Sequence, residues 1–175
     1  MFTVKTICNL KALTIMARAL RKTLRKGHSI FTRIVTSAFI AALLFIVIGY
    51  FLIGEAGDNL VMLAFDVGII VLLFLIMLME DTLNGWIAGK QMLPGAREVE
   101  TVFEADSYTA TTAVVKSTFT YEQIISICET KEYIVFFLSK KHSQIYDKKG
   151  FQDGNLQDFR LFITEKTGKA IQHIK

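Results

Sequence analysis

Two apolar runs of about twenty residues constrain this chain more than any other feature of its sequence. Ile34 to Gly54 contains no charged side chain, and Leu60 to Met79 contains one, Asp66. At a rise of roughly 1.5 Å per residue, each run can cross a hydrocarbon core about 30 Å thick. We therefore expect a transmembrane helical hairpin within residues 34–89, with spans at 34–54 and 60–79, in preference to two core helices of a soluble protein.

The distribution of charge predicts the topology of that hairpin. Residues 1–33 carry eight basic side chains and no acidic one, whereas the connector 54–59 carries Glu55 and Asp58 and no basic one. Basic residues that flank a span are retained on the cytoplasmic side of the membrane. We expect a multi-pass protein of the cell membrane with both termini in the cytoplasm.

Residues 1–33 are also patterned, and we expect a basic amphipathic helix there. Apolar residues recur at spacings of three and four, at Leu10, Leu13, Ala17, Leu20 and Leu24. One interpretation is a helix in the headgroup plane of an anionic leaflet, and the other is a helix packed on the protein's own soluble domain. The basic residues with membrane-surface contact in the first interpretation are Arg18, Arg21, Lys22, Arg25 and Lys26. Nucleic acid is not an expected partner, because the basic segment directly precedes a membrane span.

Asp66 is the one costly residue of the two runs. A carboxylate near mid-membrane costs about 2.5 to 3.5 kcal/mol on insertion scales, and such residues usually face protein or water. An antiparallel hairpin brings Asp66 opposite the region of Tyr50, whose hydroxyl is a candidate partner. The alternative is a tolerated residue near the outer face of the membrane.

Beyond the Pro94-Gly95 pair, residues 97–175 predict a cytoplasmic α+β domain. Short runs rich in β-branched and aromatic residues predict five or six antiparallel strands. These runs are Val99–Ala105, Tyr108–Val115, Ile124–Cys128, Tyr133–Leu138 and Ser143–Tyr146. The last segment has one apolar helical face instead, with Asp153 or Asn155 as its cap and Gly168 as its end. Its apolar face is formed by Leu156, Phe159, Phe162 and Ile163.

Three short elements of this domain resemble the YcxB-like family of bacterial membrane proteins. They are Tyr121-Glu-Gln-Ile124, Cys128-Glu-Thr-Lys-Glu-Tyr133 and Ile145-Tyr-Asp-Lys-Lys-Gly-Phe151, followed by Phe159. The resemblance implies two membrane spans before a small PH-like module, an antiparallel sheet with one C-terminal helix. It singles out Tyr121, Glu129, Thr130, Tyr133 and Phe151 as motif residues. Asp147 stands where the family commonly has proline, so the local strand end is expected to differ.

The charged residues of these elements suggest two interpretations. Lys140, Lys141, Lys148 and Lys149 could form a basic rim that contacts lipid headgroups or an acidic partner. The alternative is a solvated hairpin tip together with an ordinary pairing of Glu129 with a lysine.

No catalytic or cofactor signature accompanies them. The three histidines are isolated from each other and from Cys8 and Cys128, so neither a metal site nor a Cys-His dyad is expected. Glycine-rich phosphate loops and hydrolase motifs are absent from the sequence.

The sequence favours a membrane-anchored binding or scaffold module over an enzyme. Its expected partners are membrane lipids, a protein partner or a second copy of the chain. The alternative is a subunit of an oligomeric transporter, channel or envelope-stress complex, in which Asp66 faces the space between helices.

Overall fold

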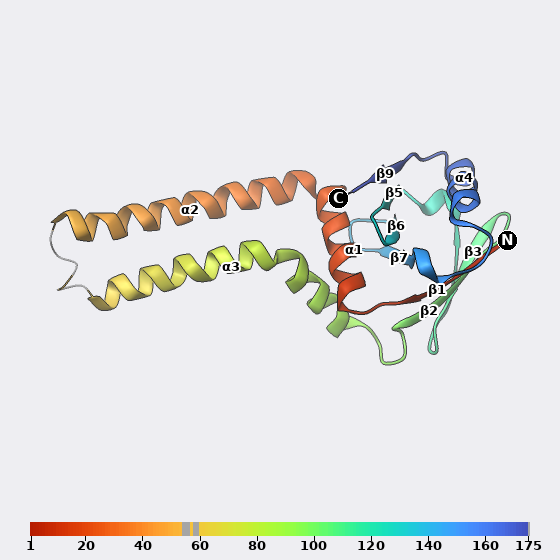
Figure 1. Ribbon diagram of the computed structural model, residues 1–175, viewed down its shortest axis with the longest axis horizontal. Helices are drawn as coiled ribbons and strands as arrows, with labels where there is room; N and C mark the ends of the chain where they lie inside the picture. Colours follow the sequence, from red (N-terminus) through yellow and green to blue (C-terminus); the bar gives the residue numbers. More distant parts are fainter. Residues whose placement is uncertain (54–56, 58–59, 175) are drawn as a thin grey trace.

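Two long helices and a two-sheet domain make up the molecule, and a short helix lies between them (Figure 1). The computed structural model describes residues 1–53, 57 and 60–174. Helices α2 (Lys26–Ile53) and α3 (Leu60–Gln91) run side by side away from the domain, and α1 (Leu10–Lys22) lies across their base. The predicted turn with Glu55 and Asp58 lies outside the described residues.

Both long helices are long and apolar enough to cross a membrane. Each helix extends beyond its predicted span, 34–54 or 60–79, only at the domain end, because α2 begins at Lys26 and α3 continues to Gln91 through a polar segment. None of the residues in their most apolar windows is buried inside the molecule. Their large hydrophobic side chains are therefore exposed on the surface of the molecule.

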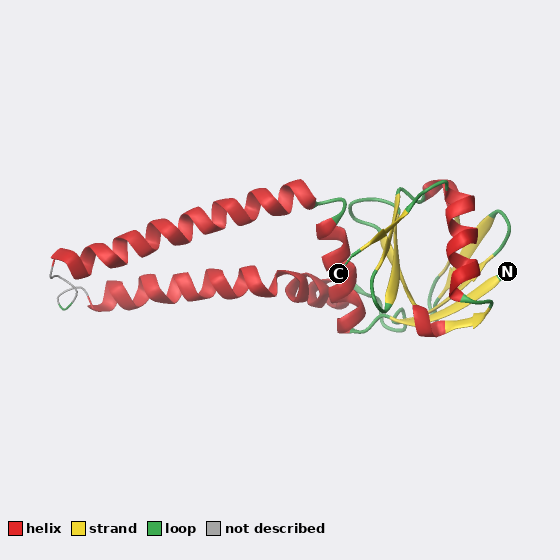
Figure 2. Ribbon diagram, turned by 45° about the horizontal axis from the view of Figure 1, so that its top comes forward, coloured by secondary structure: helices red, strands yellow, loops and turns green. Residues whose placement is uncertain are grey.

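The domain is built from two sheets and a terminal helix (Figure 2). One sheet has the strand order β4-β3-β2-β1-β8 and the other has the order β7-β6-β5-β9. All neighbouring strands are antiparallel except β5 and β9, which are parallel. The elements are β1 (Phe2–Ile7), β2 (Glu98–Phe103), β3 (Ser107–Thr111), β4 (Lys116–Thr120), η1 (Tyr121–Gln123), β5 (Ser126–Glu129), β6 (Tyr133–Phe137), β7 (Ser143–Asp147), η2 (Lys148–Gly150), β8 (Phe151–Asp153), α4 (Leu156–Thr167) and β9 (Ile171–His173).

The expected helix over residues 1–33 is wrong at its start. Residues 2–7 form β1, which lies between β2 and β8, and the helical part is divided between α1 and the beginning of α2. β1 is a strand because Thr3, Val4 and Thr6 are β-branched and buried in the sheet. The domain predicted as residues 97–175 therefore includes the first strand of the chain as well.

Helices α1 to α3 are an insertion between two paired strands. Ile7 at the end of β1 pairs with Glu98 at the start of β2. The amide of Cys8 donates a hydrogen bond of 2.8 Å to the carbonyl oxygen of Arg97. The chain therefore leaves the sheet after β1 and returns to it before β2 at neighbouring positions. The Ile7–Glu98 strand pair and the Cys8–Arg97 hydrogen bond hold these two ends of the insertion together.

Two apolar clusters lie on the two faces of β6. All five residues of β6 are buried, which is why this strand is apolar without alternation. Ile134 and Phe136 contribute to a cluster with Phe103 and Phe159, which α4 helps to cover. The alternate residues of β6 contribute to a second cluster, which includes residues of α1. α1 is therefore part of the folded domain and also the link to the long helices.

The predicted terminal helix is confirmed. The side chain of Asn155 accepts a hydrogen bond of 2.8 Å from the amide of Asp158, and the helix ends at Gly168 with a positive φ of 62°. The predicted antiparallel strands are also present, but the strand predicted over Tyr108–Val115 is shorter in the structure, where β3 ends at Thr111. A turn and the unpredicted strand β4 follow, and the sequence of β4, Lys-Ser-Thr-Phe-Thr, contains a single large apolar residue.

Candidate binding site at the base of the long helices

α1 crosses α3 at a point where α3 has glycine. A Cβ atom built on Gly85 would lie 2.7 Å from the backbone nitrogen of Thr14, so any side chain there would displace α1. One turn further along α3, a Cβ atom on Gly89 would lie 3.2 Å from a methyl group of Leu13. Small residues spaced four apart allow helix backbones to approach closely. This contact fixes α1 against the end of α3 that faces the domain.

An ion pair holds the same two helices together. The guanidinium of Arg21 donates two hydrogen bonds, each 2.6 Å long, to the carboxylate of Asp81. Arg18 donates a third, of 3.3 Å, to the same carboxylate. Only 12% of the Asp81 side chain and 17% of the Arg21 side chain are exposed, so water competes weakly with these bonds. Because this Arg21–Asp81 pair is bidentate, it fixes the rotation of α1 about its own axis as well as the position of α1.

Glu80, the residue before Asp81, connects α2 to the same network. Its carboxylate lies 3.5 Å from the guanidinium of Arg33 on α2 and 3.8 Å from that of Arg21. Arg33 and Glu80 are the first charged residues on the domain side of the two apolar runs. The polar ends of all three helices therefore meet in one layer, between the apolar part of the hairpin and the domain.

A cleft of about 500 Å³ opens in this layer, and we refer to it as the basic cleft. It lies between α1, the beginning of α2, the end of α3 and the turn that joins β6 to β7. Its lining combines apolar side chains with polar and cationic ones. The lining residues are Leu13, Met16, Ala17, Leu20, Arg21, Arg25, His28, Ser29, Thr32, Glu80, Asn84, Ile87, Ala88, Gln91, Lys140, Lys141 and Ser143.

The charges of the basic cleft do not cancel. Glu80 is its one acidic residue, and that carboxylate already faces Arg33 and Arg21. Arg25 donates one hydrogen bond of 2.9 Å to the carbonyl oxygen of Lys140, which orders the turn without neutralising any charge. Within residues 1–53, 57 and 60–174, Arg25, Lys140 and Lys141 form no salt bridge. Three cations thus remain to attract an anion.

A second cavity, of about 690 Å³, opens beside α1 and is lined largely by aliphatic atoms. Leu10, Ile15 and Ala19 line it from α1, and residues 130–132 line it from the turn after β5. Lys11 and Glu132 form an ion pair at this cavity. Arg18, which also lines this cavity, is bonded to Asp81, so Lys131 is the one cation of its lining that forms no salt bridge within the described residues, against three in the basic cleft.

The predicted contact residues of the N-terminal segment have different surroundings. Arg18 and Arg21 are bound to Asp81, and Arg25 and Lys26 are exposed. Lys22 is also exposed at the end of α1. Ala12, Leu13 and Ala19 are buried against the domain and α3, so the apolar face of α1 packs on the protein itself. Of the two interpretations of this helix, the headgroup plane of a membrane or the protein's own domain, the structure shows packing on the domain.

Glu129 is the centre of a buried ion cluster in the domain. Only 3% of its side chain is exposed, and its carboxylate accepts hydrogen bonds of 3.0 and 2.5 Å from Arg160 of α4 and forms a salt bridge with Lys148. Lys148 also donates to the carbonyl oxygen of Thr130. Burial by itself would raise the pKa of Glu129, but the two cations lower it below its ordinary value. This cluster joins β5, η2 and α4, which makes it a structural centre.

The other motif residues have structural contacts as well. The hydroxyl of Tyr121 donates to the carbonyl oxygen of Glu104 at 2.7 Å, and burial raises the pKa of this phenol. The hydroxyl of Thr130 accepts from the amide of Tyr133 at 3.1 Å, which closes the turn between β5 and β6. The rings of Phe151 and Phe159 meet edge to face at 4.9 Å.

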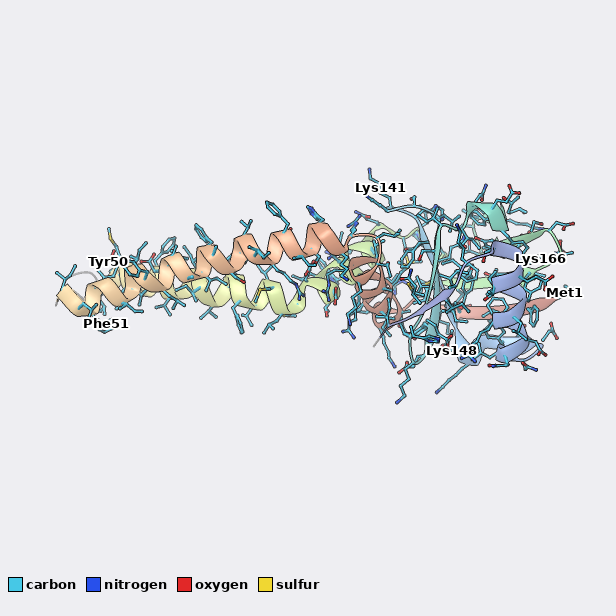
Figure 3. The ribbon with its side chains drawn as sticks, turned by 90° about the horizontal axis from the view of Figure 1, so that it is seen from above. Met1, Tyr50, Phe51, Lys141, Lys148 and Lys166 are labelled. Atoms are coloured by element: carbon cyan, nitrogen blue, oxygen red, sulfur yellow. The ribbon has the colours of Figure 1, made fainter. Side chains whose placement is uncertain are left out.

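The structure does not bring the four predicted rim lysines together. Lys140 and Lys141 lie in the turn between β6 and β7, next to the long helices, whereas Lys148 lies on the opposite side of the domain in Figure 3. The prediction of a single basic rim is therefore wrong. The reason is that β7 separates the two lysine pairs and that Lys148 is drawn to Glu129, as in the ordinary pairing that we considered as the alternative.

Tyr50 lies in α2 near the end that is far from the domain (Figure 3), and Asp66 lies in α3, six residues after its first residue, Leu60. Both residues are partly buried. Among the described residues, no hydrogen bond joins them. The candidate pairing of the carboxylate with the hydroxyl is not formed.

The two thiols are buried in the cluster beneath α1. Burial raises the pKa of both, that of Cys128 to about 11. Over the described ranges, no group of three or more His, Cys, Asp or Glu residues could hold a metal ion.

Comparison with known proteins finds a similarity to one family. Residues 103–163 match the family model described as YcxB-like protein. The match runs from the end of β2 into α4 and contains all five motif residues. The resemblance is thereby confirmed over about a third of the chain. No curated protein and no solved structure matches the chain.

Sequence reasoning missed the residues that position α1. The spacing of Gly85 and Gly89 near the end of an apolar helix is itself a signal of close helix packing. Asp81 follows Glu80 directly at the end of the second run, and eight basic residues precede the first. That complementarity predicts an ion pair, but the sequence alone does not say which of the arginines forms it.

Proposed function

We propose that this protein is a membrane-anchored binding module, with α2 and α3 spanning the bilayer and the two-sheet domain held against its cytoplasmic face. Two observations support the insertion. The apolar windows of α2 and α3 are not buried in the molecule, and helices of 28 and 32 residues are about 42 and 48 Å long. Both helices exceed the hydrocarbon thickness of about 30 Å, which leaves their domain ends outside it.

The Arg33–Glu80 ion pair supports a specific depth for the hairpin. Ile34–Ile53 and Leu60–Met79 are each about 30 Å long at 1.5 Å per residue. If these segments fill the hydrocarbon, Arg33 and Glu80 lie together at the inner boundary, where a charged pair is solvated by headgroups. α1 and the basic cleft then lie in the headgroup layer. Trp86, over which Lys90 stacks at 3.9 Å, lies six residues beyond Glu80 on the domain side, where an interfacial aromatic anchor is expected.

The orientation follows from the charges on that side. The excess of Lys and Arg before α2 favours retention of the domain side in the cytoplasm, with both termini there. Four strands in one antiparallel meander, β1 to β4, three in a second, β5 to β7, and then α4 fit the PH-like outline that the family resemblance implies. In this arrangement the hairpin is inserted between the first two strands.

The observation that carries the proposal is the position of α1. It packs on the domain through Ala12 and Leu13 and on α3 through Gly85 and Asp81, so the domain is fixed to the hairpin without a flexible linker. A fixed domain presents the same surface to the membrane in every molecule. This is what a binding module at a membrane surface requires, because the ligand then meets a preorganised site.

Membrane extraction and reporter fusions test the proposal. The full chain should stay with the membrane pellet in alkaline carbonate. A fluorescent protein fused to the C-terminal end should fluoresce, whereas a phosphatase that is active only outside the cytoplasm should be inactive at the same position. Release by carbonate would contradict the anchor, and phosphatase activity would contradict the orientation.

A further inference from the structure

We propose that the basic cleft binds the headgroup of one anionic phospholipid of the inner leaflet. This inference rests on the proposed function, since it requires the base of the long helices to lie at the membrane surface. The binding residues are Arg25 of the segment between α1 and α2 and Lys140 and Lys141 of the turn between β6 and β7. These two segments are far apart in the sequence and meet only in the folded protein.

The charges of the cleft select an anion. Arg25, Lys140 and Lys141 form no salt bridge in the part of the chain that the structure describes, while Glu80 is occupied by Arg33 and Arg21. The hydrogen bond from Arg25 to the carbonyl oxygen of Lys140 uses one guanidinium nitrogen, and the rest of the planar fork is left for a phosphate group. His28 and Ser29, which also line the cleft, add hydrogen-bonding capacity.

The neutral part of the lining selects an amphiphile. Leu13, Met16, Leu20 and Ile87 form the apolar part of a cleft of about 500 Å³. An inorganic phosphate would fill only a small fraction of that space and would leave these side chains facing water. A glycerophospholipid places its phosphate among the cations and its glycerol and upper acyl carbons against the apolar side chains.

The position of the cleft indicates the source of the ligand. The cleft begins at Glu80 on α3 and at Thr32 on α2, next to the Arg33–Glu80 pair that marks the inner boundary of the hydrocarbon in the proposed orientation. A lipid of the inner leaflet therefore reaches the cleft without leaving the bilayer. An acidic protein segment would have to displace headgroups first, so we favour the lipid as occupant.

Native mass spectrometry of the full chain, released from detergent micelles, measures this directly. Phosphatidylglycerol added to the micelles should give a one-lipid adduct at concentrations at which phosphatidylcholine gives none. The variant Lys140→Gln/Lys141→Gln should bind the anionic lipid about tenfold more weakly or worse, because each surface cation adds appreciably to the attraction. It leaves the backbone carbonyl that Arg25 binds in place.

Lys166→Gln/Lys169→Gln is the matched control. It removes the same charge from exposed positions at the far end of the domain, as Figure 3 shows for Lys166, and should bind like the original chain. Arg25→Gln is the second test variant and should also weaken binding. Thermal unfolding of each variant without lipid separates loss of binding from loss of fold.

Three outcomes would overturn the inference. They are equal binding of the two lipids, equal weakening by both double lysine variants, and displacement of the lipid by millimolar inorganic phosphate. The last result would identify a soluble phosphate-bearing anion as the ligand. All three can occur in a chain that passes the carbonate and reporter tests, so failure of the lipid site is distinguishable from failure of the membrane anchor.

Discussion

Arg21 and Asp81 are 60 residues apart in the sequence, and their side chains are joined by two hydrogen bonds of 2.6 Å. One belongs to the short helix of the domain and the other to the second long helix. Because only a small part of either side chain is exposed, the pair acts as a rigid connection rather than a surface ion pair.

The first prediction concerns this pair. Asp81→Asn should lower the free energy of unfolding of the domain by about 1.5 to 3 kcal/mol, because charged hydrogen bonds in a shielded site are lost and Arg21 keeps an uncompensated charge. Arg21→Gln should cost a similar amount. In thermal or denaturant unfolding in detergent, the double variant should lose clearly less than the sum of the two. Additive losses would mean that the pair is not energetically coupled.

The second prediction compares two glycines of the same helix. Gly85→Ala should destabilise the protein, because its methyl group would lie 2.7 Å from the backbone of Thr14 and would push α1 away. Gly68→Ala is the control, since a Cβ atom there has nothing within 4 Å. Alanine has the higher helix propensity by up to about 1 kcal/mol, so this variant should be neutral or stabilising. The melting temperatures of the two variants in detergent should therefore move in opposite directions, or only that of the Gly85 variant should fall.

The sequence predicts the long helices and α4 well, because their signals are local. Apolar length defines α2 and α3, and the caps Asn155 and Gly168 define the ends of α4. β1 is different. Its sequence, Phe-Thr-Val-Lys-Thr-Ile, is short and adjoins a strongly helical basic segment, and its strand conformation depends on pairing with β2, more than ninety residues away. No local pattern contains that information.

The same distinction holds for the site. Arg25, Lys140 and Lys141 were each recognisable as basic residues, but the sequence grouped Lys140 and Lys141 with Lys148 and Lys149 because these are close in the chain. The fold groups them with Arg25 instead, through the turn between β6 and β7. Proximity in sequence is a poor guide to which charges share a cleft once a strand such as β7 intervenes.

The third prediction follows from the position of β1. A fragment of residues 97–174 lacks the strand between β2 and β8 and should not unfold cooperatively or give dispersed amide resonances. A chain in which residues 34–79 are replaced by a short glycine-serine linker keeps β1, α1 and the Arg33–Glu80 contact. This version should fold as a soluble domain. Cooperative folding of the 97–174 fragment would show that β1 is dispensable.

The fourth prediction concerns pH and Glu129. Arg160 and Lys148 lower the pKa of this carboxyl below its ordinary value of 4.5, so its ionised form stabilises the fold above pH 4.5. That contribution decreases as the pH falls below 4.5 and is lost once the pH passes the lowered pKa. Glu129→Gln should cost about 3 kcal/mol near neutral pH and progressively less at acid pH.

Urea unfolding over a range of pH measures this effect, and Glu122→Gln is the control because Glu122 is exposed at η1. The control should show the same pH dependence as the original chain. A constant difference between the Glu129 variant and the original chain at every pH would contradict the predicted coupling of the cluster to protonation.

The fifth prediction is that Asp66→Asn leaves abundance, membrane insertion and stability nearly unchanged, within about 0.5 kcal/mol. Asp66 is only six residues from the start of α3, close to the outer face in the proposed orientation, and within the described residues it has no hydrogen-bond partner to lose. Removing the charge lowers the cost of insertion instead of raising it. Quantitative blotting of membrane fractions measures abundance and insertion, melting temperatures in detergent measure stability, and chemical crosslinking measures association between copies. A loss of abundance together with a loss of crosslinked oligomers would instead place Asp66 at an interface between copies, as in an oligomeric transporter or channel. The contrast with Asp81→Asn, which removes a charge from the same helix in a paired and shielded place, separates a carboxylate that the fold uses from one that it merely accommodates.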